Sequence, residues 1–121
     1  MSEALSFAKS VYAAVDSMDE TNLAEFLTDE CTFTFGNAKP VVGRAAAAEA
    51  SKAFLSLIAG IKHEINDVWS VDDTVITRLT VTYTRNDKKT MSFPAITIWH
   101  VEGMKISDYR IYIDNTPLFA S

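Results

Sequence analysis

Apolar residues recur with a helical period over the first part of the chain. Leu5, Ala8, Val11 and Val15 follow one another at intervals of three or four residues, which predicts an amphipathic helix over residues 2–18. The polar stretch 19–22 supplies side chains that can cap a helix. A second, short helix is therefore expected to start within one or two residues of the end of the first.

From residue 31 the pattern changes to alternation. Residues 31–35 alternate β-branched and aromatic side chains up to Gly36, which predicts a short strand ending in a turn. The alanine-rich segment 44–61 returns to helical spacing and predicts a third helix, the longest of the three, closed near its end by Gly60. The remainder predicts four strands over 63–71, 74–85, 90–101 and 105–114, separated by short turns.

This order of elements, α-α-β-α-β-β-β-β, defines an α+β fold. Turns of only a few residues require neighbouring strands to be antiparallel, so the helices are expected to pack on one face of a curved, mostly antiparallel sheet. The 121 residues match the usual length of one domain, and no repeat or linker interrupts them. Residues 1–121 are therefore expected to form a single domain.

Composition and charge narrow the classes of partner. Eleven basic and sixteen acidic residues give a formal charge of -5, which repels phosphate backbones and makes a nucleic-acid partner unfavourable. Cys31 is the single cysteine, so neither an internal disulfide nor a cysteine-based metal site can form, and a reducing compartment is expected. The N-terminal residues do not match a signal peptide, and no apolar run reaches the ~20 residues of a membrane span. We therefore expect a cytoplasmic protein with no membrane partner.

Three local patterns, taken with the element order, resemble the nuclear transport factor 2-like superfamily and its SnoaL-like branch. They are Tyr-Ala-Ala-Val-Asp-Ser-Met-Asp at 12–19, Pro-Val-Val-Gly-Arg at 40–44, and the last strand at 103–114. The resemblance covers essentially the whole chain. It implies a cone-shaped fold whose helices close the mouth of a strongly bent sheet around a pocket for a small apolar or aromatic molecule. It also implies a homodimer formed through the outer face of the sheet, and no cofactor.

Membership of this superfamily alone cannot select a reaction, because it includes isomerases, dehydratases, cyclases, epoxide hydrolases and non-catalytic binders. The epoxide hydrolases that resemble this chain use an Arg and two Asp, at positions that correspond here to Arg78, Thr80 and Ile111. The two carboxyl positions of the ketosteroid isomerases fall near Thr34 or Phe35 and at Thr97. Without those carboxylates the proton transfers have no carrier, so both activities are disfavoured.

The dehydratase-like members give a better match. They place an Asp late in the first helix opposite a His on the strand after the third helix, and here these are Asp16 and His63. A carboxylate that contacts an imidazole fixes its tautomer and raises its basicity, which suits a general acid or base. Tyr12 or Arg78 is expected near the substrate oxygen. The alternatives remain open that all of these are structural residues, with Asp16 bonded to nearby backbone or to Arg44.

The resemblance also assigns an inner wall to the cone. On the last strand Tyr109 and its alternate neighbours are expected to face inward, and Arg110 and Asp114 are expected to pair on the outer face. The complete expected ligand pocket is Phe33, Phe35, Phe93, Thr97, Trp99, Tyr109, Ile111 and Ile113. Such a wall suits a flat apolar ligand, unless these side chains fill the cone themselves. His100 is expected on the opposite face from Trp99, and no metal site is proposed.

Two functions from different classes follow. One is a lyase or isomerase with dehydratase-like general acid/base chemistry on a small apolar hydroxylated or carbonyl compound. The other is a non-catalytic dimeric ligand-binding module of the same fold. A catalytic pair requires Asp16 and His63 within hydrogen-bond reach beside an open cavity, whereas a binder requires only the cavity.

Overall fold

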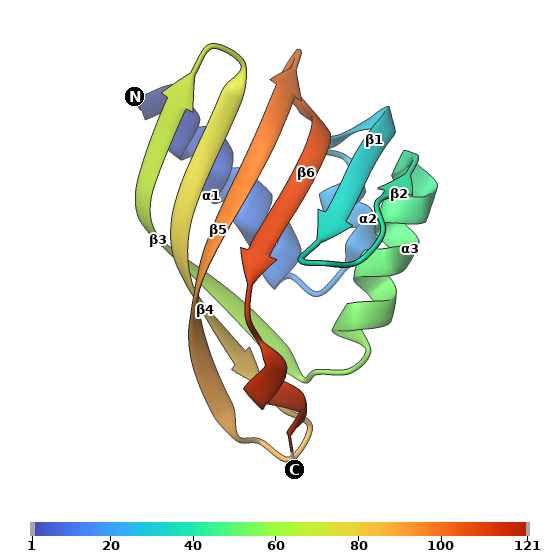
Figure 1. Cartoon of the computed structure of the whole chain (residues 1–121), viewed down its shortest axis with the longest axis vertical. Helices are drawn as coiled ribbons and strands as arrows, with labels where there is room; N and C mark the ends of the chain where they lie inside the picture. Colours follow the sequence, from blue (N-terminus) through green and yellow to red (C-terminus); the bar gives the residue numbers. More distant parts are fainter. Residues whose placement is uncertain (1, 121) are drawn as a thin grey trace.

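The computed structural model describes residues 2–120, and Figure 1 shows three helices on one side of a curved sheet. The helices are α1 (Ser2–Asp16), α2 (Glu20–Ala24) and α3 (Arg44–Leu55). The strands are β1 (Leu27–Phe35), β2 (Val41–Val42), β3 (Gly60–Val71), β4 (Thr74–Thr84), β5 (Thr90–Glu102) and β6 (Lys105–Ile113), followed by the 3-10 helix η1 (Thr116–Phe119). The expected α+β cone fold is confirmed.

The six strands form one sheet in the order β2-β1-β6-β5-β4-β3. Strands β3 to β6 follow one another through short turns and are antiparallel, while β1 runs parallel to β6. Strand β2 was not expected, because two residues are too few to show alternation. It pairs with β1 beside Phe33 and so extends the sheet towards α3.

Helix α3 ends earlier than its sequence pattern predicts. It stops at Leu55 and has 12 residues, fewer than the 15 of α1, so the expectation that it is the longest helix was wrong. After Leu55 the chain unwinds, which lets Ile58 enter the core with 5% of its surface exposed. The Ala59 N–H then donates to the Thr84 carbonyl at 2.8 Å, and Gly60 becomes the first residue of β3.

The core lies between the helices and the inner face of the sheet. Its largest member is Trp99, which is fully buried, and Cys31 belongs to the same core with no exposed surface. Burial, with a smaller contribution from the Asp108 carboxylate, raises the pKa of the Cys31 thiol to about 11. None of the helices found between residues 2 and 120 combines the length and apolar character needed to cross a membrane.

Candidate functional site

The end of α1 and the start of β3 bring Asp16 and His63 together. The backbone N–H of His63 donates to Asp16 Oδ2 at 3.0 Å, and His63 Nδ1 lies 2.6 Å from Asp16 Oδ1. A carboxylate can only accept, so in the neutral imidazole Nδ1 carries the proton and Nε2 is the free base. Within residues 2–120 no side chain or backbone group forms a hydrogen bond with Nε2.

The position of β3 explains both contacts. It is an edge strand of the sheet, so one row of its backbone groups has no partner strand. Asp16 satisfies one of these amides and fixes the imidazole with its other oxygen. The side chain of His63 is only 9% exposed and that of Asp16 25%. The pair is therefore largely sheltered from water, where such contacts are stronger than on an open surface.

Tyr12 packs flat on the imidazole. The two rings lie 4.6 Å apart at their centroids with an angle of 24° between their planes. The Tyr12 hydroxyl contacts the hydroxyls of Thr77 at 2.7 Å and Thr97 at 2.5 Å, and those two lie 2.5 Å from each other. Burial raises the pKa of Tyr12 despite these hydrogen bonds, which lower it. The three hydroxyls form a closed triangle that satisfies them inside the core.

Replacing Tyr12 with Phe is expected to destabilise the protein by about 1–3 kcal/mol, because the buried Thr77 and Thr97 hydroxyls each lose a partner. The ring that packs on His63 remains, so any turnover should survive. Urea unfolding measures the loss. Thr90→Val, which removes a hydroxyl from an exposed residue, is the control and should change stability by less than about 0.5 kcal/mol. A Tyr12→Phe protein as stable as wild type would show that the triangle contributes nothing.

His63 also lines a cavity of about 180 Å³ inside the cone. The sheet and α3 supply most of its wall, which is almost entirely apolar. The lining residues are Val15, Leu23, Phe33, Phe35, Ala38, Lys39, Val41, Ala50, Ser51, Phe54, Leu55, Ile61, His63, Leu79, Val81, Tyr83, Ala95, Thr97, Tyr109, Ile111 and Ile113. Space therefore remains inside the cone, and the side chains do not fill it.

Most of the expected pocket residues line this cavity, but two do not. The six that line it are Phe33, Phe35, Thr97, Tyr109, Ile111 and Ile113. Trp99 lies deeper, packed against Phe7 and Tyr109 with ring centroids 5.8 and 5.6 Å away. Phe93 faces inward further along β5 and packs on Tyr83 instead, at 5.9 Å.

The sequence interpretation missed the contribution of β4. Alternate residues of this strand are buried, and Leu79, Val81 and Tyr83 among them line the cavity. The alternation was visible in the sequence and could have identified them. Lys39, in the loop after β1, carried no comparable signal.

Arg78 lies away from the cavity, which corrects the expectation that it stands near a substrate oxygen. It belongs to the outward-facing set of β4, and its Nε donates to Asp67 Oδ2 at 2.8 Å. The expected pair of Arg110 with Asp114 is also wrong. Arg110 donates to Asp108 at 2.9 Å, while Asp114 accepts from the Thr116 N–H at the start of η1.

A second, larger space lies outside the cone, in a groove of about 770 Å³ between α1 and β3. Asp16 and His63 line it, together with exposed residues such as Lys9 and Trp69. The His63 ring thus separates this groove from the enclosed cavity. The cavity is apolar and mostly buried, as small-molecule sites usually are, whereas the groove is more open and more polar. Among residues 2–120 no three His, Cys, Asp or Glu side chains cluster closely enough to hold a metal ion.

The structure is thus an α+β cone with an apolar cavity inside it, and His63, which contacts Asp16, stands in the cavity wall. The profile of the SnoaL-like domain family matches residues 8–109. The chain therefore belongs to the SnoaL-like domain family. A comparison with curated protein sequences gives no significant match.

Solved structures agree on the fold. An LEH-like epoxide hydrolase from M. tuberculosis is 17% identical with a TM-score of 0.80, over 98% of this chain and 87% of that one. A protein classed as a SnoaL-like polyketide cyclase from Jannaschia sp. CCS1 is 11% identical with a TM-score of 0.82, over 97% and 89%. A protein with a ketosteroid isomerase-like fold from Catenulispora acidiphila, solved in complex with trimethylamine, is 14% identical with a TM-score of 0.81, over 88% and 83%. At these identities the likeness shows the fold alone.

Proposed function

We propose that this protein is a lyase or isomerase of the dehydratase type, in which His63 removes the proton next to a carbonyl group of a small apolar compound. The observation that carries the proposal is the double contact of Asp16 with His63. This contact leaves Nε2 as the unprotonated nitrogen of a ring that also lines an apolar cavity. A general base needs this combination of a fixed tautomer and access to the substrate.

Dehydration of a β-hydroxy ketone requires no second reactant. His63 Nε2 takes the α-proton, the electron pair of that bond forms the carbon–carbon double bond, and hydroxide leaves the β-carbon. The imidazolium returns its proton to the hydroxide, which gives an enone and water. The Asp16 carboxylate and the face of the Tyr12 ring both stabilise the imidazolium while it exists.

The carbonyl oxygen needs a donor while charge develops on it. Tyr83 and Tyr109 line the cavity. Burial raises the pKa of both phenols, and the pKa of Tyr109 lies well above that of a free tyrosine. Both hydroxyls therefore stay protonated at neutral pH and can donate a hydrogen bond to the oxygen. This role replaces the one expected of Tyr12 and Arg78.

The test uses 3-hydroxycyclohexanone, a simple β-hydroxy ketone. Conversion into 2-cyclohexenone and water is followed by the ultraviolet absorbance of the enone, and the same mixture in deuterium oxide is examined by proton NMR for exchange at the α-carbon. The proposal expects the protein to accelerate the exchange above the buffer rate. Exchange at the buffer rate for this ketone and for a panel of related β-hydroxy ketones would refute proton abstraction.

A non-catalytic ligand-binding module is the second candidate. It is favoured by the scarcity of polar groups around the cavity, since binding an apolar molecule requires burial and little else. The NMR experiment separates the two, because a binder shifts the resonances of the ketone without exchanging its α-protons.

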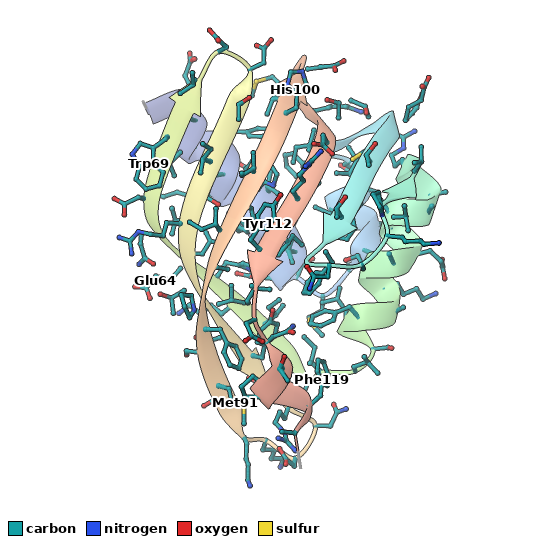
Figure 2. The ribbon with its side chains drawn as sticks, viewed as in Figure 1. Glu64, Trp69, Met91, His100, Tyr112 and Phe119 are labelled. Carbon is teal, nitrogen blue, oxygen red and sulfur yellow. The ribbon has the colours of Figure 1, made fainter. Side chains whose placement is uncertain are left out.

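The proposal includes a homodimer formed through the outer face of the sheet. An apolar patch, here the outer patch, crosses this face at neighbouring register positions of β3 to β6: Trp69, Ile76, Ile96, Ile98 and Tyr112. Trp69 and Tyr112 remain 47% and 45% exposed, and Figure 2 shows both on the outside of the sheet. Contiguous apolar surface of this kind typically marks a protein interface.

Replacing Ile98 with Lys is expected to convert the dimer into a monomer, because a buried, unpaired charge at the centre of the outer patch is costly. Light scattering coupled to size-exclusion chromatography measures the mass. Thr82→Lys is the control, since Thr82 lies on the same face outside the patch. A wild-type protein that is already monomeric, or an Ile98→Lys protein that remains dimeric, would refute this interface.

A cytoplasmic location is also part of the proposal. The single thiol, Cys31, is buried and forms no disulfide within the chain, which fits a reducing compartment.

A further inference from the structure

We infer that the ligand is a single-ring, mainly apolar molecule that carries one carboxylate, with the ring inside the cavity and the carboxylate at its opening beside Lys39. The inference rests on the proposed function for the identity of the ligand site, and adds the size and charge of the ligand. Three features of the cavity support it: its volume, the location of its opening and the charges around it.

The volume limits the ligand to one ring. A dry apolar cavity of about 150 Å³ holds a benzene molecule. The cavity of this protein, at about 180 Å³, has room for such a ring and a small substituent. Fused or linked ring systems are too large unless the wall moves. The walls on both sides are well-packed sheet and helix, and Phe33, Leu79 and Tyr109 are each less than 10% exposed.

The exposure of the lining residues locates the opening. Ala38 and Lys39 are the only exposed residues among those that line the cavity, and all the others are buried or half-buried. Their loop is held in place at its start, where the Gly36 N–H donates to the Ile111 carbonyl at 2.8 Å and the Ala38 N–H to the Phe35 carbonyl at 2.9 Å. The loop therefore presents Lys39 at the entrance in a defined place.

The charges at the opening favour an anion. Lys39 is the only Lys, Arg, Asp or Glu among the residues that line the cavity. No carboxylate of residues 2–120 lies within ion-pair distance of it, unlike Arg44, which pairs with Asp29 at 2.6 Å. An ammonium group at the rim of an apolar pocket is free to bind a carboxylate, while the ring of the same molecule is buried.

Binding of three simple probes tests the inference: phenylacetate, its neutral analogue phenylacetamide, and the two-ring acid 1-naphthylacetate. Dissociation constants are measured by calorimetry or NMR titration at low salt for wild type, Lys39→Met and the control Lys105→Met, which removes an equal charge from exposed residue 105. Phenylacetate is expected to bind wild type about fivefold more tightly than Lys39→Met, the upper range for an exposed ion pair. Raising salt from about 0.02 M to about 0.5 M should remove this difference, because it screens exposed charges.

The controls separate charge from size. Phenylacetamide should bind both variants and wild type equally, and 1-naphthylacetate should bind wild type at least about tenfold more weakly than phenylacetate, a difference of about 1.4 kcal/mol. Equal effects of Lys39→Met and Lys105→Met would overturn the carboxylate site, and naphthylacetate binding as tight as phenylacetate would overturn the size limit. Failure of all three probes to bind would overturn the inference entirely. None of these outcomes depends on turnover, so the proposed proton abstraction stands or fails separately.

Discussion

Replacing His63 with Gln is expected to slow α-proton exchange and dehydration of the β-hydroxy ketone by about 10²–10⁴-fold, the usual contribution of a general base. Glutamine has a similar reach and can still donate to Asp16, but its amide cannot take up a proton at neutral pH. Among the described residues that line the cavity, His63 is the only histidine. The measurement is the exchange rate in deuterium oxide at saturating ketone.

His100→Gln is the matched control for this change. His100 lies on the outer face, is 47% exposed at its side chain and approaches Glu102 at 3.7 Å, so its loss should leave the exchange rate unchanged. Circular dichroism and thermal unfolding establish that both variants are folded. A His63→Gln protein that exchanges the α-proton as fast as wild type would exclude His63 as the base.

The fold was largely readable from the sequence because its strands alternate. In β4 and β5 nearly every second residue is buried or half-buried, and the same period of two is visible in the sequence from Thr74 to Trp99. Helix α3 was overestimated for a physical reason. Helix propensity and helical spacing continue past Leu55 in the sequence. The helix nevertheless ends there, because Ile58 is buried in the core and β3 begins at once. Tertiary packing overrides helix propensity at such points.

Arg78 illustrates a conflict between two sources of prediction. The resemblance to epoxide hydrolases drew attention to this position. The alternation of β4 placed Leu79 and Val81 inward, and therefore Arg78 outward, where it pairs with Asp67. The period of two follows from the geometry of a strand and is the stronger constraint. When a relative suggests that a polar side chain lies in a pocket, the alternation of its own strand decides whether that side chain can face inward.

The sequence pointed to a pocket but not to its open volume, because that volume depends on how far side chains from many elements fall short of filling the cone. Trp99 was expected in the ligand pocket, yet it is fully buried below it against Tyr12 and Tyr109. The role of Lys39 depends on the path of the loop after β1, which has no periodic pattern.

The pairing of Asp16 with His63 was expected, but its most informative detail was not. The second contact, from the His63 backbone N–H to Asp16 Oδ2, depends on β3 being an edge strand. That property follows from the strand order and from no local pattern. It gives Asp16 a structural role beside the chemical role that we propose, and a single substitution can separate the two.

Replacing Asp16 with Asn is expected to slow α-proton exchange by about 10²–10⁴-fold while the fold is retained, because the amide selects the wrong imidazole tautomer. The His63 backbone N–H requires an acceptor, so the amide oxygen must face it at the position of Oδ2. The amide NH₂ then faces Nδ1 and donates to it, which moves the imidazole proton to Nε2 and removes the base. Asp67→Asn is the control, because Asp67 lines the groove between α1 and β3, and it should keep the wild-type rate. Two measurements decide the matter: the exchange rate, and the ¹⁵N chemical shifts of the His63 ring, which report the tautomer. An Asp16→Asn protein with wild-type exchange and an unprotonated Nε2 would show that the carboxylate only holds the edge of β3.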